Sequence, residues 1–378
     1  MKKRFLSIFL VVTMTSALLA GCGGGSQSAE SQAPAEAEGA AESGEAAETE
    51  AAAPSDGEVQ DVELLAASST VQNVGIAVAD VVTKNCGTIR MAATGTNSTE
   101  ANIVQMMQSG DRSHTFYMSS AAPYLSAKHG VAAFEQYEPT GDQRLVAALM
   151  YGVNGFVTTN PDIKSVEDLD GKKVAMFADQ MPQQMAQAAF EIVGINVEIV
   201  TMTFADQFTA LGDGLVDACL YLGTGLPNGE ALVPVGPLQE LVANKGGEVY
   251  AVTFPTDLQE QAVAKAGFEE IWPYSPITVP SGSLSDSYKE EFDAYGSVTG
   301  MICAWADTDE ELVYQVTKTL CENYGKLGEY MTELGQITPD LMLSMLYMAQ
   351  DESDIHPGAL RYYTEAGLWP DTWKNANG

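Results

Sequence analysis

Hydroxyl, amide and glycine residues stand at the ends of several predicted strands, in both halves of the chain. Their side chains, and the backbone N–H groups beside them, can hydrogen-bond a small carboxylate or an amino acid without transforming it. Any one of them alone is better explained as a helix cap or a turn residue, so the prediction rests on the set. We predict ligand binding by Ser68, Ser69, Thr70, Gln72, Asn73, Thr96, Asn97, Ser98, Ser119, Ser120, Gln180, Gly223 and Thr224.

No reactive constellation accompanies these polar residues. The sequence has no nucleophile elbow, no phosphate-binding glycine loop, and no histidines or cysteines at metal-ligand spacing. We therefore expect a protein that is not an enzyme and that uses no cofactor and no metal. Arg112 or Arg144 could clamp a carboxylate, but ion pairs within the protein are the simpler role for both. We interpret His356 as a structural residue of the C-terminal part.

The cysteines give little evidence for a redox site or a specific disulfide. No C-x-x-C pair occurs, and Cys219 and Cys303 stand in apolar runs typical of strands, where a buried free thiol is common. One disulfide is possible in an exported protein, but the sequence favours no particular pair. The cysteines of the expected folded part are Cys86, Cys219, Cys303 and Cys321.

The elements that must position the polar residues alternate between apolar strands and amphipathic helices. This alternation predicts an α/β fold with a largely parallel sheet. Asn97 followed by Glu100 predicts a capping box at the start of the second helix. Expected strands are 62–67, 89–93, 115–118, 145–159, 174–177, 198–202, 216–222, 249–254 and 297–305; expected helices are 71–84, 98–108, 183–193, one from 204 onward and 309–324.

A helix that ends at a glycine and turns into a short strand occurs twice, at Gly110 and at Gly214. This repeated pattern predicts two related lobes that are joined near residues 145–160. We assign residues 61–150 to the first lobe and 151–275 to the second. Residues 276–378 would return to the first lobe and end in C-terminal helices.

The N-terminal residues indicate export. Lys2, Lys3 and Arg4 precede an apolar stretch of signal-peptide length, which ends in Leu-Ala-Gly before Cys22 and resembles a bacterial lipobox. We predict a lipoprotein signal peptide over residues 1–21 and lipidation of Cys22, which would anchor the protein in the membrane lipid on the extracytoplasmic face of the cell membrane. The alternative is a plain signal peptide. Residues 22–60 are rich in Ala, Glu, Gly and Ser, and they predict a disordered acidic tether.

The charge excludes one class of partner. The chain has 18 Lys+Arg against 51 Asp+Glu, a formal net charge of −33. Nucleic-acid binding needs clustered cations, so we expect no nucleic-acid partner. The same field argues against electrostatic docking on anionic lipid.

The C-terminal segment carries a specific resemblance. Residues 355–367 read IHPGALRYYTEAG and resemble the near-terminal His-Pro-Gly-Ala…Arg-Tyr-Tyr…Gly signature of the TAXI solute-binding proteins of TRAP transporters. The resemblance spans about residues 61–370, with supporting similarities at 164–174, 214–218, 225–227, 278–282 and 314–318.

This resemblance implies a two-lobed, periplasmic-binding-protein-like α/β fold with a hinge and a central cleft. The family captures a small organic acid or amino acid by hinge closure and delivers it to the membrane subunits of a sodium-driven transporter; we expect a monomer. The ligand loops depart from the family pattern, because the loop after Thr70 has no tyrosine and Phe177–Pro182 replaces a Gly-Ser-Gly-like loop. Asp179 in that loop would repel a carboxylate, whereas Ser119 matches the family's polar position after the third strand.

Three other functions stay open at this point. The first is a receptor for an ATP-driven importer, with a thiamine-precursor or sulfonate-like solute. The second is an exported enzyme, which steady turnover of a bound compound would reveal. The third is a component of a sensor that presents its solute-bound form to a membrane partner.

Overall fold

The structure, a computed structural model, describes residues 59–67, 70–177, 180–227, 229, 232–349 and 351–369. The predicted signal peptide, the lipidation residue Cys22 and the tether up to residue 58 lie outside the described residues. Ser68, Ser69 and Asp179 also lie outside them. The predicted domain boundaries stay predictions.

The first of two sheets contains eight strands among the described residues. Its strands follow the order β10-β9-β4-β13-β3-β1-β2, and β12 pairs with β13 at the side. β1 is parallel to β2 and β3, whereas β13 is antiparallel to both β3 and β4. The strands are β1 Gln60–Ala67, β2 Ile89–Thr96, β3 Thr115–Ser119, β4 Gln143–Asn154, β9 Gly223–Gly225, β10 Leu232–Pro234, β12 Ser275–Val279 and β13 Phe292–Trp305.

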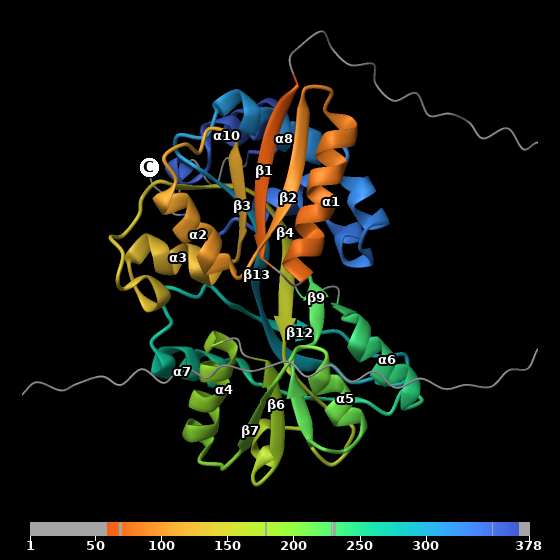
Figure 1. Cartoon of the computed structure of the whole chain (residues 1–378). Coiled ribbons are helices and arrows are strands. Elements are labelled where there is room, and N and C mark those ends of the chain that lie inside the picture. Colours follow the sequence, from red (N-terminus) through yellow and green to blue (C-terminus); the bar gives the residue numbers. More distant parts are fainter. Residues whose placement is uncertain are drawn as a thin grey trace, which may run out of the picture. The chain divides into compact units, whose positions relative to one another are not determined.

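Helices cover this sheet where their apolar stripes fit it. Helix α1 (Thr70–Asn85) packs along β1 and β2 through Val74, Ala77 and Val78, which are all fully buried (Figure 1). Helix α8 (Glu310–Glu322) begins at Asp309, whose side chain accepts a hydrogen bond from the Leu312 N–H. The remaining helices near this sheet are α2 Thr99–Gln108, α3 Ala121–His129, α9 Pro339–Ser344 and α10 Pro357–Glu365, with 3₁₀ turns at Ala132–Phe134, Tyr324–Glu329, Thr332–Gln336 and Glu352–Asp354.

The second sheet contains five strands among the described residues, in the order β11-β5-β8-β6-β7. β6 is parallel to β7 and β8, and β5 is antiparallel to β8 and β11. Its strands are β5 Phe156–Thr158, β6 Lys173–Phe177, β7 Glu198–Met202, β8 Ala218–Leu220 and β11 Tyr250–Val252; its helices are α4 Gln180–Val193, α5 Asp206–Gly212, α6 Gly236–Asn244 and α7 Thr256–Ala266, with a 3₁₀ turn at Val166–Leu169.

The two sheets repeat one topology. The order β2-β1-β3-β13-β4 in the first sheet corresponds to β7-β6-β8-β5-β11 in the second. In each sheet, three parallel strands are followed by an antiparallel strand, which is β13 in the first sheet and β5 in the second. The mixed α/β fold with two sheets is confirmed, and this repeated order is the structural counterpart of the repeat predicted from the glycine turns.

Two long strands connect the sheets. β4 leads through Gly155 directly into β5, and β13 begins among residues of the second sheet, because the Phe254 N–H donates to the Asp293 carbonyl at 3.0 Å. Tyr295 of β13 packs edge-on against Phe254 and Trp272, with ring centroids 5.9 and 5.6 Å apart. The strand thus contributes to two hydrophobic cores.

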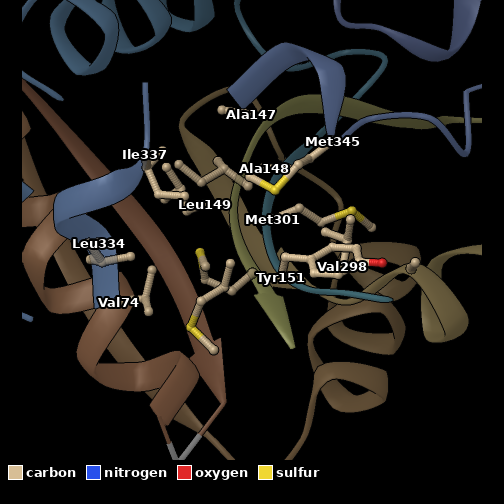
Figure 2. Packing of buried hydrophobic residues seen from close by; sticks show 14 of the residues in the cluster. Val74, Ala147, Ala148, Leu149, Tyr151, Val298, Met301, Leu334, Ile337 and Met345 are labelled. Atoms are coloured by element: carbon tan, nitrogen blue, oxygen red, sulfur yellow. The ribbon is translucent and has the colours of Figure 1, made fainter. Parts of the chain in front are cut away.

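The larger core surrounds β4 and β13. Figure 2 shows Leu149, Tyr151 and Met301 of these strands close to Ile337 and Met345 of the C-terminal part. All five side chains are at most 3% exposed. The segment that follows α8 therefore covers one face of the connecting strands, as the predicted C-terminal helical packing implies. The smaller core lies around β5, β6 and α4 and includes Phe156, Val174, Phe190, Phe254 and Trp272.

Several boundaries differ from the sequence expectations, among them the expected strand 145–159, which is split into β4 and β5 of different sheets. The expected strand 216–222 is split into β8 and β9, which belong to different sheets, and the break falls at Tyr221 with φ 146°. The cap of α2 is Ser98 and not Asn97, because the Ser98 hydroxyl accepts the Ala101 N–H. α4 begins at Gln180, since a proline in the first turn, here Pro182, costs no helical hydrogen bond. β13 begins at Phe292, five residues earlier than expected.

Candidate functional site

The carboxyl ends of β1, β2 and β3 lie at one edge of the first sheet. Ala67 pairs with Thr96, and Leu65, two residues earlier, pairs with Tyr117 of β3. The parallel register therefore brings the predicted residues Thr96 and Ser119 to the same edge. Ligands of open α/β sheets bind beyond such edges. The edge that the sequence predicted in this lobe is thus formed.

The hydroxyls at this edge have partly structural roles. Ser98 caps α2, as described above. Ser119 is fully buried, and its hydroxyl donates to the Ser120 carbonyl at 3.1 Å. Ser120 precedes α3, and its side chain makes no capping hydrogen bond. Asn97 is exposed at the end of β2.

The predicted residues of α1 divide between two positions. Gln72 lies over the end of β2, because a Cβ at Gly95 would be 2.8 Å from the Gln72 Nε2 atom. Asn73 is exposed, and Thr70 opens the helix. Gln72 is thus placed at the carboxyl edge, next to Thr96.

A buried amide that the sequence reasoning missed ties this edge together. The side chain of Asn102 in α2 is fully buried, and its Nδ2 donates to the carbonyls of Leu65 at 3.3 Å and Met118 at 2.8 Å. Its Oδ1 accepts from the Thr96 hydroxyl at 2.5 Å. The signal for it was an asparagine four residues after the capping serine, on the inward face of the helix. Asn102 therefore fixes the ends of β1, β2 and β3 relative to one another.

The second sheet has an equivalent edge, at Phe177 of β6 and Leu220 of β8. Four aromatic rings gather there: Phe204 packs edge-on against Phe177, Phe208 and Tyr221, with centroids 5.9, 5.9 and 4.9 Å apart. Gln180 opens α4 immediately after this edge. The positive φ of Tyr221 is a conformation that L residues rarely adopt, and such strain is concentrated at functional sites.

Gln207 is the counterpart of Asn102 in the second lobe. The Thr203 hydroxyl accepts the Asp206 N–H, and the Thr203 carbonyl accepts the Gln207 N–H, which is the same pattern that Ser98 makes with Ala101 and Asn102. Gln207 is fully buried, yet neither its Nε2 nor its Oε1 has a hydrogen-bond partner. Buried amide atoms without a partner in the fold are uncommon in proteins, so this position calls for a functional explanation.

The two edges flank one segment of the connecting strands. Ser119 pairs with Met301, which pairs with Ala148 of β4, so the first edge lies beside residue 148. Phe156 pairs with Leu220, so the second edge lies beside residue 156. The residues between them, 149–155, span about 23 Å as extended chain. All of these residues belong to one compact unit of the chain.

One face of this segment is polar. Gly152 pairs with Ser297 of β13 on one side and with Thr224 of β9 on the other. Asn154, two residues further, points to the same face. The oxygens Asn154 Oδ1, Thr224 Oγ1 and Thr299 Oγ1 are buried and have no hydrogen-bond partner. Thr224 was predicted from sequence; Asn154 and Thr299 were not, because each stands inside an apolar strand.

Gly223, also predicted as a ligand residue, has a packing role. A Cβ at this position would lie 2.1 Å from the Val233 carbonyl oxygen of β10. The close approach of β9 and β10 therefore requires glycine here.

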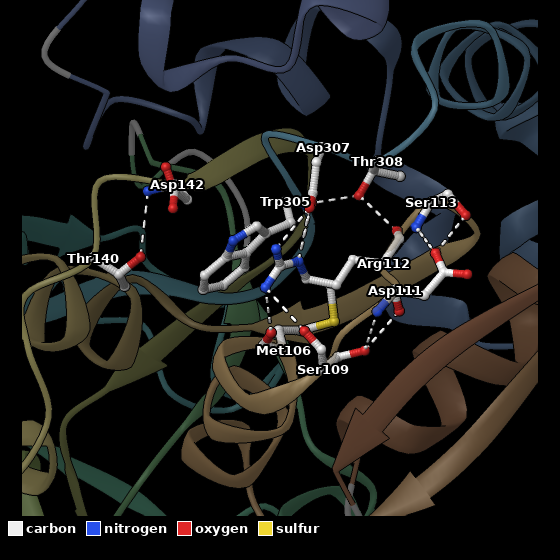
Figure 3. A network of polar contacts seen from close by, with 10 residues as sticks. All are labelled: Met106, Ser109, Asp111, Arg112, Ser113, Thr140, Asp142, Trp305, Asp307 and Thr308. Carbon is white, nitrogen blue, oxygen red and sulfur yellow. Dashed lines mark hydrogen bonds and ion pairs between the residues drawn. The ribbon is translucent and has the colours of Figure 1, made fainter.

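The four arginines of the described residues are bound within the protein. Figure 3 shows Arg112 facing Asp307, at 2.6 Å, with Trp305 beside it. The hydrogen bond from Arg112 lowers the pKa of Asp307. Arg144 donates to the carbonyls of Gly141 and Gln143. The expected intramolecular role of Arg112 is confirmed; Arg90 pairs with Asp61, and Arg361 with Glu310 and Glu311.

His356 caps α10 and joins it to β4. Its Nδ1 accepts the Gly358 N–H, and its backbone N–H donates to the Leu145 carbonyl at 2.9 Å. The side chain is buried, and burial lowers its pKa to about 4. The structural interpretation of His356 is confirmed.

Other surface and chemical features lie apart from these edges. A hollow of about 260 Å³ is lined by Phe208, Gly212 and Leu241, between α5 and α6. The part of the chain that the structure describes contains no cluster of three or more His, Cys, Asp and Glu side chains arranged for a metal ion. No helix within the same ranges combines the length and hydropathy needed to cross a membrane.

The chain is similar, at a low level, to several solved structures. MatC from Rhodopseudomonas palustris with bound malate is 12% identical, with 84% of this chain and 98% of that chain covered and a TM-score of 0.44. Another R. palustris protein, with adipate, is 14% identical, with coverages of 82% and 96% and a TM-score of 0.46. A TctC solute binding protein from Polaromonas is 10% identical, with coverages of 82% and 98% and a TM-score of 0.45. Likeness at this level carries no argument about the ligand of the present chain.

A comparison with protein families is more specific. The model of the NMT1-like family matches residues 66–367, a range that begins in β1 and ends just after α10. The match therefore includes both sheets, both carboxyl edges and the connecting strands. Because it spans most of the chain, the protein belongs to the NMT1-like family.

Proposed function

We propose that this protein is an extracytoplasmic receptor that binds a small solute and passes it to a membrane transporter of the sodium-coupled TRAP type. The TAXI resemblance of residues 355–367 supports the transporter type, and it suggests a small organic acid or an amino acid as the solute. Membership of the NMT1-like family supports a role in solute binding. The polar residues at the two edges are hydroxyls and amides, which supports binding without catalysis.

One observation carries the proposal. The carboxyl edges of two parallel three-strand units flank the same connecting strands, and buried polar atoms without partners lie on those strands and next to the second edge. A protein that needed only stability would pair or remove such atoms, because each one costs about 1–3 kcal/mol. A solute that binds there would supply the missing hydrogen bonds. Opening and closing about the connecting strands would admit and release it.

Solute binding is tested by thermal unfolding of the purified full chain with a broad panel of amino acids, dicarboxylates and keto acids. A ligand present at one hundred times its Kd stabilises the folded state by about 2.7 kcal/mol. This should raise the Tm by about 5 °C or more. Unchanged melting curves across the panel would contradict the proposal, and steady turnover of a bound compound would favour the exported enzyme.

The membrane anchor is a separate part of the proposal. Lipidation of Cys22 would hold the protein on the extracytoplasmic face of the membrane, while the acidic segment that follows separates the folded part from the lipid. Cys22→Ala should move the protein from the membrane fraction to the soluble fraction and abolish incorporation of labelled fatty acid. Retention of the variant in the membrane would contradict the lipid anchor.

The transporter type is tested by uptake in proteoliposomes that contain the membrane subunits encoded beside this protein. Uptake that depends on a sodium gradient and on this receptor supports the TRAP type. Uptake that requires ATP would instead support a receptor of an ATP-driven importer.

A further inference from the structure

We infer that the polar face around Gly152, formed by Asn154 of β4, Thr224 of β9 and Thr299 of β13, binds a hydroxyl or amino group of the solute. This inference rests on the proposed function and specifies which part of the solute is recognised here. The three side chains share one face of the sheet.

The register and the space around Gly152 place these side chains together. Thr224 is the direct antiparallel partner of Gly152, and directly paired residues point to the same face. A Cβ at Gly152 would lie 2.7 Å from Thr299 Cγ2 and 3.2 Å from Thr299 Oγ1, so the threonine side chain occupies the space above this glycine. Asn154 follows Gly152 at the strand period of two.

Thr299 reaches this position because β13 is irregular there. The register between β13 and β4 shifts between Val298 and Gly300, which leaves Thr299 without a paired residue on β4. Bulges of this kind re-aim a side chain and are frequent beside binding sites. The opposite face of the same strands carries Tyr151 and Val298 and is covered by the C-terminal segment (Figure 2). Asn154, Thr224 and Thr299 therefore lie on the face away from Tyr151 and Val298.

The hydrogen-bonding capacity of the three groups defines the chemistry of their partner. Asn154 is 3% exposed and Thr224 is 5% exposed, so neither side chain is satisfied by bulk water. The Asn154 Oδ1 atom can only accept a hydrogen bond, whereas each threonine hydroxyl can donate or accept. A carboxylate cannot donate to Asn154. A hydroxyl or an ammonium group can, and a hydroxyl can also accept from one of the threonines.

The position of the face fits recognition of one end of a solute. It lies between the two carboxyl edges: Thr299 is two residues from Met301, the partner of Ser119, and Asn154 precedes Gly155, whose carbonyl accepts the Tyr221 N–H. A solute whose carboxylate is held by backbone N–H groups at a helix start would turn its other polar substituent toward this face. The face therefore selects among small acids by the presence of that substituent.

The experiment measures binding of matched probe pairs to the full-length wild-type protein, to Thr224→Val and to Thr299→Val by isothermal titration calorimetry and by thermal unfolding. The probe pairs are serine and alanine, malate and succinate, and alanine and propionate. In each pair the second compound lacks only the polar substituent. Thr317→Val is the matched control, because the Thr317 hydroxyl is equally buried but donates to the Val313 carbonyl at 2.7 Å.

We expect the wild-type protein to prefer the substituted member of at least one pair by about tenfold or more. Thr224→Val and Thr299→Val should reduce that preference to less than about threefold. The Tm of the free protein should stay equal or rise, because valine has the shape of threonine and each substitution removes only an unpaired hydroxyl. Thr317→Val should lower the Tm and keep the preference.

The outcomes separate the two proposals. If the wild-type protein binds none of the probes and no compound of the broader panel, the proposed function fails, and this inference fails with it. If it binds only panel compounds that carry neither a hydroxyl nor an amino group, only this inference is overturned. If the wild-type protein binds a probe but shows no preference within any pair, or if both valine variants keep the preference, only the inference about the polar face is overturned. A loss of Tm in Thr224→Val and Thr299→Val as large as that in Thr317→Val would also overturn it, because the hydroxyls would then have partners in the fold.

Discussion

Replacement of Asn102 by leucine should be among the most destabilising single changes in the first lobe. The leucine removes the donor for the Leu65 and Met118 carbonyls and the acceptor for the Thr96 hydroxyl, all at the ends of β1, β3 and β2. The 3.3 Å bond to Leu65 is the weakest of the three. Each buried polar group left without a partner costs about 1–3 kcal/mol, and the three losses are not fully additive. We expect a total loss of about 3 kcal/mol.

Gln207→Leu provides the control at the equivalent position of the second lobe. Gln207 is as buried as Asn102, but both of its amide atoms lack partners, so leucine removes unpaired polar atoms and no hydrogen bond. We expect its free energy of unfolding to be unchanged or higher. Both variants and the wild-type protein are compared by urea unfolding, followed by far-ultraviolet circular dichroism, with no solute added.

The free energy of unfolding should therefore be lower for Asn102→Leu than for Gln207→Leu, and this difference is the quantity to measure. Equal losses in both variants would show that burial alone, and not the hydrogen bonds of Asn102, decides the effect. A loss below about 1 kcal/mol in Asn102→Leu would show that the strand ends are held by other contacts.

Three further predictions concern other groups. Lys128→Met should lower the free energy of unfolding, measured by urea denaturation, by about 1–2 kcal/mol, because Lys128 Nζ and Asp354 Oδ1 are 2.6 Å apart and the side chains are only 19% and 10% exposed. The double variant Lys128→Met/Asp354→Leu should regain most of that loss. A double variant as unstable as Lys128→Met would contradict the pairing. Burial lowers the pKa of His356 from 6.5 to about 4, so between pH 6.5 and pH 4 the unfolded chain binds a proton at this imidazole while the folded protein does not. The stability that depends on a neutral His356 is therefore fully present above pH 6.5. The free energy of unfolding should fall by up to about 3 kcal/mol as the pH drops from 6.5 to 4. His356→Gln should remove that part of the pH dependence, and an identical slope in both proteins would count against a neutral buried His356. The four described cysteines are free and buried, and burial raises the pKa of the Cys219 and Cys303 thiols. All four should therefore react with a thiol reagent only after unfolding, and a reductant should leave the Tm unchanged. Fast reaction of the native protein would refute this prediction.

The sequence predicts the order of strands and helices well, because local apolar patterns decide it. Val62–Ala67 and Ile89–Ala93 alternate with a helix whose inward face is Val74, Ala77 and Val78, and the structure has all three elements. The strand order was not predictable in the same way. β13 begins at Phe292 and lies between β3 and β4, which end at Ser119 and Asn154, so only the tertiary fold brings the three strands together.

The candidate site was predicted in part. Thr96, Ser98, Ser119 and Ser120 could be placed at one edge because they follow parallel strands, and the structure places them there. Asn102 and Gln207 were missed because an amide inside a helix gives no local signal of its buried partners. Thr299 was missed because its orientation depends on a bulge, which is set by pairing with β4 and not by its own neighbours in sequence.

The insertion of β13 between β3 and β4 also sets the order in which the protein can be assembled. All strands of the second sheet lie within residues 156–252, so this sheet can form from one continuous stretch of chain. The first sheet must wait, since β3 and β4 have no common neighbour until Phe292–Trp305 is available. The lobe that is synthesised first is therefore completed last, and its unpaired strands need protection during that interval.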